Sequence, residues 1–193
     1  MKRVFIVHGW GGDPNEGWFS WLANELEQRG FIVQVPTMPD TDTPVIEKWV
    51  SHLAHLVGEP DESTYLVGHS IGCQAIMRYT ETLDNKIGGA LFVAGWFHLT
   101  ADSYEKEGDE EIAKPWIETS IDFPKVRSSA NDFAAIFSDD DPFVPLGDEE
   151  LFKERLGAST IVLSKRGHFS GSDGITKLPE ALEALLRMSR DRV

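Results

Sequence analysis

Residues 64–72 read Thr-Tyr-Leu-Val-Gly-His-Ser-Ile-Gly, and the fold class can be inferred from them. Its first four residues favour a short buried strand, and apolar side chains recur at helical spacing from the isoleucine to about Thr82. Gly68, Ser70 and Gly72 match the pattern G-x-S-x-G, in which a serine lies on a sharp turn between strand and helix. Small residues on both sides of the serine let the two elements approach each other. The context therefore favours a nucleophilic serine over an ordinary glycine-rich turn.

The rest of the chain alternates between short apolar strands and longer amphipathic helices. The further strands are predicted at 4–7, 31–35, 90–94, 133–137 and 159–163, and the further helices at 18–29, 44–57, 148–156 and 178–190. Thr43 is the predicted N-cap of the second of these helices, with Pro44 in its first position. Nearly continuous apolar strands separated by helices predict an α/β fold, a doubly wound, mostly parallel six-stranded sheet with helices on both faces.

One segment, from about residue 97 to 131, does not follow this alternation. It mixes acidic side chains with Pro115-Trp116 and Phe123-Pro124, and it is too long for a simple connection. Two interpretations stay open: a solvated excursion anchored by one turn at Pro115-Trp116, or a small cap over a pocket. In both cases residues 1–193 are expected to form a single domain, because one core usually holds roughly 100–200 residues.

The composition argues against several classes of function. A formal net charge of −14 repels phosphate backbones and anionic lipids, so neither a nucleic acid nor a membrane is an expected partner. The apolar run 4–7 is shorter than the roughly 7–15 residues of a secretory leader, and no stretch approaches the ~18 of a membrane span. Cys73 is the single cysteine, which suits a reducing compartment, and a cytoplasmic location is expected.

A nucleophilic serine needs an imidazole to take its proton and a carboxylate to orient that imidazole. In folds with this serine turn the chain order is serine, acid, histidine, each on a loop after a strand. Of the six histidines, only His168 lies on the loop after the last predicted strand, so it is the predicted base.

The predicted acid comes from three consecutive aspartates that follow the strand 133–137. Asp141 is the first choice, because the fixed φ of Pro142 helps to hold the loop. Asp139 and Asp140 are expected to make turn hydrogen bonds instead. A calcium site built from the three is not expected, because spaced oxygen ligands are lacking.

The first predicted strand ends in a glycine-rich turn, residues 8–12, that can bring a backbone N–H beside the serine. Trp10 is the first candidate for this donor and Gly11 the alternative, while the amide of Ile71 supplies the second donor of an oxyanion hole. A dinucleotide-binding loop is rejected, because G-x-G-x-x-G is absent. The aromatic residues predicted to line the substrate pocket, for which core packing is an equal alternative, are Trp96, Trp116, Phe143 and Phe169.

Short motifs that span nearly the whole chain point to a known family. They are Gly17-Trp18, Met38-Pro39-Asp40, Gly68-His69-Ser70-Ile71-Gly72, Met77-Arg78-Tyr79, Pro115-Trp116, Asp140-Asp141-Pro142-Phe143 and Gly167-His168-Phe169. Together they resemble the YdeN / retinoblastoma-binding protein nine family of small serine hydrolases. The resemblance implies a compact α/β-hydrolase fold, a triad of Ser70, Asp141 and His168, and esterase or amidase activity on small substrates. Binding of retinoblastoma protein is not expected, because residues 56–60 do not match the L-x-C-x-E motif to which it is ascribed.

The sequence therefore predicts a serine hydrolase that cleaves small carboxylic esters or amides through a covalent acyl-enzyme. Ser70 would attack the carbonyl while His168 accepts its proton, and the Trp10 and Ile71 amides would stabilise the oxyanion. No metal or organic cofactor is expected. The alternatives left open are a thioesterase or peptidase on the same fold, and a binding protein that keeps the fold without turnover.

Overall fold

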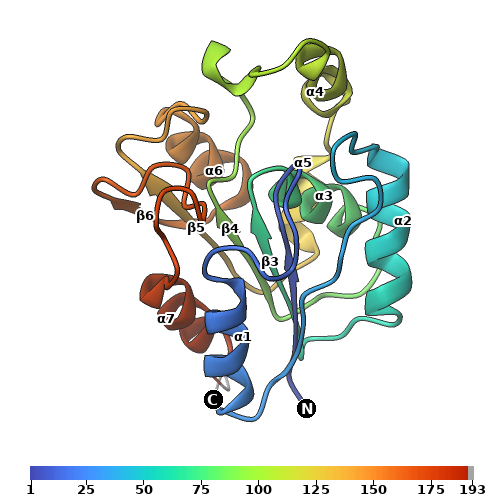
Figure 1. Ribbon diagram of the computed structural model, residues 1–193. Coiled ribbons are helices and arrows are strands. Elements are labelled where there is room, and N and C mark those ends of the chain that lie inside the picture. Colours follow the sequence, from blue (N-terminus) through green and yellow to red (C-terminus); the bar gives the residue numbers. More distant parts are fainter. Residues whose placement is uncertain (191–193) are drawn as a thin grey trace.

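A computed structural model describes residues 1–190 of the chain. Figure 1 shows one central sheet with helices packed against it. The six strands run parallel to their neighbours in the order β2-β1-β3-β4-β5-β6, so the predicted sheet is confirmed. Their bounds are β1 Arg3–Val7, β2 Ile32–Gln34, β3 Thr64–His69, β4 Gly89–Val93, β5 Phe133–Ser138 and β6 Ser159–Leu163.

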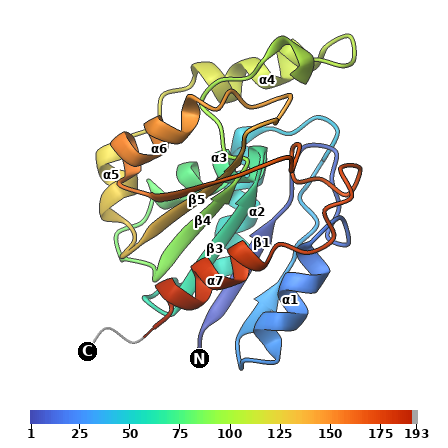
Figure 2. The same cartoon turned by 90° about the vertical axis from the view of Figure 1, so that its left-hand side faces the viewer.

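Helices cover both faces of the sheet (Figures 1 and 2). The helices on one face are α1 (Phe19–Glu27) and α7 (Pro179–Met188), and those on the other are α2 (Ile46–Val57), α3 (Ile71–Thr80), α5 (Phe123–Ser128) and α6 (Asp148–Leu156). Side chains of β1 alternate between the two cores: Phe5 packs in a cluster with Trp49, and Ile6 in a cluster with Trp18. Burial on both faces explains why this strand reads as an unbroken apolar run.

The strand order creates a crevice where the functional loops meet. From β1 the chain turns to one side to form β2, and then crosses back to form β3 on the other side of β1. The loops that follow β1 and β3 therefore diverge at the carboxyl ends of the strands, where open α/β sheets bind their ligands. Ser70 directly follows β3, and the glycine-rich turn 8–12 directly follows β1.

Close packing explains the two glycines around Ser70. The backbone of Ser70 has φ 52° and ψ −122°, a conformation that is uncommon for a residue with a side chain. A Cβ on Gly68 would lie 2.7 Å from the amide nitrogen of Cys73, and one on Gly72 only 2.4 Å from the carbonyl oxygen of Val7. Because these neighbours are backbone atoms that cannot move aside, both positions require glycine.

The predicted start of α2 is wrong by two residues. The helix begins at Ile46 with Val45 as N-cap, and Val45 is still extended at φ −117° and ψ 129°. The carbonyl of Pro44 accepts the indole N–H of Trp116 at 3.0 Å. This contact ties Pro44 to a distant segment, and the extended backbone of Val45 leaves Pro44 outside the first turn.

The 97–131 segment contains more regular structure than the single turn that one of the two interpretations anticipated. It forms a short 3-10 helix η1 (Ala101–Ser103), α4 (Asp109–Glu118) and α5. α4 was missed because Pro115 lies inside it and acidic residues fill its first turn, which resembles a solvated loop. Figures 1 and 2 show η1 and α4 above the carboxyl ends of the strands, on the side of the sheet where Ser70 lies.

None of the helices described for residues 1–190 is both long enough and apolar enough to cross a bilayer.

Replacing Gly72 by alanine is expected to destabilise the protein by about 3 kcal/mol, because the new methyl group would overlap the backbone of β1. Gly147 gives a matched control, since no atom lies within 4 Å of its Cβ position and its φ of −61° suits alanine. Gly147→Ala should change the free energy of unfolding by less than about 0.5 kcal/mol. Urea unfolding of both variants tests this, and equal effects would contradict the packing argument.

Candidate active site

The imidazole of His168 and the carboxylate of Asp141 are in direct contact. Nδ1 of His168 lies 2.9 Å from Oδ2 and 3.1 Å from Oδ1 of Asp141, and the two side chains are only 10% and 3% exposed. Oδ1 of Asp141 also accepts the backbone N–H groups of Phe143 at 2.9 Å and Val144 at 3.1 Å. The turn after β5 therefore fixes the carboxylate, which in turn orients the imidazole.

Two neighbouring rings and a hydrogen bond to its carbonyl also hold His168 in place. Its ring packs between those of His69 and Phe143, with centroids 5.0 Å away in both cases. The carbonyl of His168 accepts a hydrogen bond from Nε2 of His69 at 2.7 Å. Because a carbonyl can only accept, we assign the proton of His69 to Nε2.

His69 is a neutral packing residue. Burial, followed by the nearby charge of His168, lowers the pKa of His69 to about 3. The side chain therefore adds no positive charge next to the imidazole of His168 near neutral pH.

Ser70 and His168 line the same cavity, which has a volume of about 590 Å³. Ser70 is half-buried, and its backbone is held by a hydrogen bond from its N–H to the carbonyl of Val93 at 3.0 Å. Within residues 1–190, no hydrogen bond joins the Ser70 hydroxyl to the imidazole. Such contacts are often long before a substrate binds and shorten in the reacting complex. The structure thus brings the three predicted triad residues to one site, with the acid and the base already in contact.

The turn after β1 leaves one of its two candidate amides free. The N–H of Gly11 donates to the carbonyl of Thr41 at 2.9 Å, so this alternative donor is already engaged. The N–H of Trp10 makes no hydrogen bond within the described chain, and Trp10 lines the cavity. Ile71 is the first residue of α3, where an amide has no partner inside the helix. Both residues predicted as oxyanion donors therefore lie at the cavity with amides available to a ligand.

His8 shapes this turn from within the protein. It is fully buried, its Nε2 accepts the N–H of Met38 at 3.0 Å, and its Nδ1 lies 2.8 Å from the carbonyl of Gly9. The indole N–H of Trp10 donates to the carbonyl of Asp42 at 2.9 Å. The contacts with Met38 and Asp42 hold the turn against the loop after β2, which fixes where the Trp10 amide can lie.

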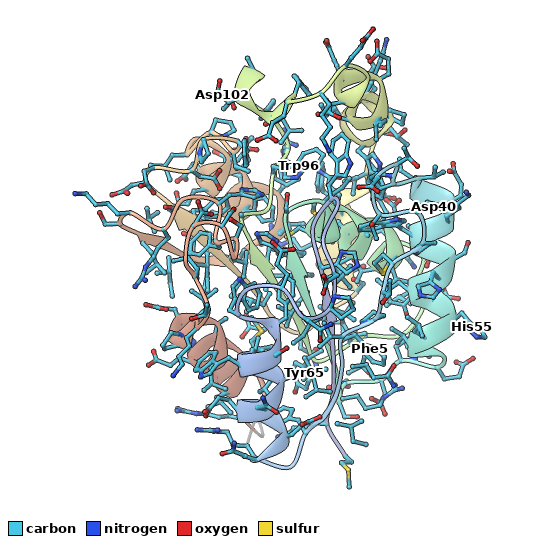
Figure 3. The ribbon with its side chains drawn as sticks, in the orientation of Figure 1. Phe5, Asp40, His55, Tyr65, Trp96 and Asp102 are labelled. Carbon is cyan, nitrogen blue, oxygen red and sulfur yellow. The ribbon has the colours of Figure 1, made fainter. Side chains whose placement is uncertain are left out.

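Only two of the four predicted pocket aromatics reach the cavity. Trp96 and Phe143 line it, and Figure 3 shows Trp96 beneath the 97–131 segment. Trp116 is 1% exposed and packs edge-on against the ring of Trp49. Phe169 is also 1% exposed and belongs to the core on the α1 and α7 face. Trp116 and Phe169 therefore pack in the core, which was the alternative interpretation of these residues.

Two further apolar side chains of the cavity come from the 97–131 segment, and they were not among the pocket residues predicted from the sequence. Leu99 and Ile112 line the cavity opposite the strand ends. They lie in and just before the helices missed in that segment, so their side-chain direction could not be inferred from periodicity.

The rim of the cavity is acidic. Its charged lining residues include one lysine, Lys106, and five carboxylates: Glu16, Asp42, Glu105, Glu107 and Asp109. Within residues 1–190, none of these carboxylates forms an ion pair. The mouth of the cavity therefore carries a net negative charge that acts on any ligand that enters.

No group of residues within 1–190 has the arrangement of a metal site.

Comparison with known proteins adds independent evidence. Residues 4–187 match the family described as Serine hydrolase. The hydrolase YdeN of Bacillus subtilis is 31% identical over 186 residues, which cover 95% of this chain and 94% of YdeN. Serine hydrolase RBBP9 of Rattus norvegicus is 29% identical over 174 residues, 89% of each chain. The crystal structure of the ydeN gene product from B. subtilis superimposes with a TM-score of 0.89 and 29% identity over 97% of this chain and 98% of that one.

The buried His69 makes stability depend on pH. Its pKa is about 3 in the folded protein, against about 6.5 in an unfolded chain. Between these values only the unfolded state takes up the proton, so stability is complete above the upper value and falls as the solution is acidified. The wild type should lose about 2 kcal/mol through this residue between pH 7 and pH 5.

A His69→Gln variant lacks the titrating group and should lose correspondingly less over the same interval. Urea unfolding of both proteins at the two pH values measures the difference. An identical pH dependence in the variant and the wild type would show that His69 is not kept neutral by the fold.

Proposed function

The chain belongs to the serine hydrolase family, and from this premise we propose that it hydrolyses small carboxylic esters or amides through an acyl-enzyme on Ser70. The observation that carries the proposal is the shared cavity: Ser70 and His168 both line it, and His168 is hydrogen-bonded to the buried carboxylate of Asp141. A serine beside an imidazole that a carboxylate orients is the arrangement that nucleophilic catalysis requires.

The first half of the reaction acylates the enzyme. Ser70 Oγ attacks the carbonyl carbon while Nε2 of His168 accepts the hydroxyl proton, and Asp141 stabilises the imidazolium that forms. The oxyanion of the tetrahedral intermediate accepts hydrogen bonds from the amides of Trp10 and Ile71. His168 then donates its proton to the leaving oxygen or nitrogen as the bond from the carbonyl carbon breaks. An alcohol or amine departs, and the acyl group stays on Ser70.

The second half repeats these steps with water. His168 takes a proton from the water as it attacks the acyl carbon, and then returns a proton to Ser70 Oγ as the ester bond breaks. The carboxylic acid leaves and the free enzyme is restored. Each residue acts twice, and the cycle needs no cofactor.

The cavity wall favours substrates with an apolar group of modest size. Its volume of about 590 Å³ accommodates a small ester, and Trp96, Leu99, Ile112 and Phe143 supply the apolar lining. We propose that the 97–131 segment serves as a cap over this cavity. Arg78, buried within α3, supports that role, because its Nη2 donates to the carbonyls of Trp116 at 2.8 Å and Thr119 at 2.9 Å and so anchors the end of α4.

A fluorophosphonate probe tests the nucleophile. The wild type should be labelled on Ser70, as peptide mapping will show, and Ser70→Ala should not be labelled. His168→Ala should lower kcat on a small ester by roughly 10³-fold or more, because the serine loses its base.

His55 offers a matched control for the histidine, since it lies exposed on α2, away from the cavity (Figure 3). His55→Ala should retain wild-type activity. Labelling of another residue, or a His168→Ala variant as active as His55→Ala, would refute the proposed mechanism.

The acidic rim predicts discrimination by charge. A neutral ester should be hydrolysed with a kcat/KM on the order of tenfold higher than an isosteric ester that ends in a carboxylate, since the rim repels the anion. Added salt should narrow the difference by screening. Glu105→Gln combined with Glu107→Gln removes two of the exposed rim charges and should narrow it as well. Equal kcat/KM values for the two esters at low salt would contradict this prediction.

A further inference from the structure

The loop that carries His168, residues 164–170, has an uncommon backbone. Lys165 has φ 56°, Gly167 has φ 53° and Phe169 has φ 58°, so three of its residues lie in the left-handed region and two of them bear side chains. A non-glycine residue persists there only when its surroundings over-determine the conformation. The contacts that fix this loop therefore decide where the imidazole lies.

From one side, the loop is held by three consecutive side chains at the end of β5, Ser138, Asp139 and Asp140. They accept successive backbone N–H groups of the loop: Lys165 to Asp139 Oδ1 at 2.9 Å, Arg166 to Ser138 Oγ at 3.0 Å and Gly167 to Asp140 Oδ1 at 2.9 Å. Ser138 Oγ donates in turn to Asp140 Oδ1 at 2.7 Å. Asp140 thus makes a local turn hydrogen bond, as expected of it, and both aspartates also bind the neighbouring loop.

From the other side, the loop is held by Asp173. Its Oδ2 accepts the backbone N–H of His168 at 3.0 Å, the N–H of Ser170 at 2.9 Å and the hydroxyl of Ser170 at 2.5 Å. The carboxylate also lies against Gly167, where a Cβ would come within 2.4 Å of Asp173 Oδ1. Glycine is needed at this position for that reason as well as for its φ.

We propose that Asp140 and Asp173 are positioning residues for His168. Asp140 accepts the backbone N–H of Gly167 and Asp173 that of His168 itself, and these two amides set the direction of the imidazole. The inference rests on the proposed function, in which His168 is the base. Asp140 is the residue next to Asp141, so a single turn holds both the backbone and the ring of the histidine. Asp141 and His168 are thereby held in a fixed relative position, with Nε2 of His168 directed toward the cavity.

The chemistry of Asp140 suits this role. The hydrogen bond from Ser138, followed by that from the N–H of Gly167, lowers the pKa of Asp140. The carboxylate is therefore fully ionised near neutral pH, and charged acceptors form stronger hydrogen bonds than neutral ones.

Alanine and asparagine variants at both positions separate positioning from simple stability. Asp140→Ala and Asp173→Ala should lower kcat roughly 10- to 100-fold, as small misplacements of a catalytic group do. KM should stay within about twofold, because neither Asp140 nor Asp173 lines the cavity. Asp140→Asn and Asp173→Asn should recover most of kcat, since an amide oxygen still accepts the same N–H groups.

Asp122 provides the matched control. Its exposed carboxylate accepts one backbone N–H, from Lys125 at 3.0 Å, at the start of α5 and away from the cavity. Asp122→Ala should lose a similar hydrogen bond and a similar amount of stability while retaining wild-type kcat. The downfield proton resonance of the Nδ1–H bonded to Asp141 adds a spectroscopic measure, which should weaken or shift in the two alanine variants and persist in the control.

The outcomes distinguish this inference from the proposed function. If the wild type is not labelled by the fluorophosphonate probe, the proposed function itself fails. If it is labelled, and the alanine variants are labelled at the wild-type rate with an unchanged resonance, the positioning role is overturned. Should an alanine variant fail to fold, Ser138→Ala provides a second test, because it removes the hydrogen bonds that Ser138 makes with Arg166 and Asp140. This variant should lower kcat severalfold. A wild-type kcat in Ser138→Ala would also overturn the inference.

Discussion

The hydrogen bond between Nδ1 of His168 and the carboxylate of Asp141 is the contact on which the rest of the site depends. It joins the loops after β5 and β6, which are neighbours in a parallel sheet and so end at the same edge. Without it the imidazole could turn its protonated nitrogen toward Ser70 and would no longer accept a proton there. The backbone N–H groups of Phe143 and Val144 fix the carboxylate by donating to its Oδ1.

Most non-glycine residues with a strained, positive φ lie beyond the carboxyl ends of the strands. Among residues 1–190, four of the five non-glycine residues with positive φ lie beyond the ends of strands: Ser70 and Ala94 directly follow β3 and β4, and Lys165 and Phe169 lie in the loop after β6. Their conformations are sustained by hydrogen bonds to the sheet, such as those from Ser70 to Val93 and from Ala94 to Ile136. A rigid sheet buried on both faces can support such loops, which is why the catalytic geometry and the stability of the fold are linked.

The strands and most helices could be predicted from apolar periodicity, and the bounds of α6 and β6 match the prediction because Gly157 marks a clear stop between them. The same reasoning failed for α4, where Pro115 and an acidic first turn conceal a helix that packs through Trp116. Periodicity also could not show that Trp96 and Phe143 line the cavity while Trp116 and Phe169 pack in the core. Large aromatic side chains suit both environments. The bond from Gly167 to Asp140 was missed for a different reason: the two residues are 27 apart in the sequence, and only strand pairing brings them together.

The most direct test of the account is the crystal structure of the protein after reaction with a small alkyl phosphonate ester. We expect a covalent bond from phosphorus to Ser70 Oγ, a phosphoryl oxygen within hydrogen-bond distance of the Trp10 and Ile71 amides, and Nε2 of His168 facing the position of the departed group. An adduct on a different residue, or a phosphoryl oxygen turned away from both amides, would contradict the account.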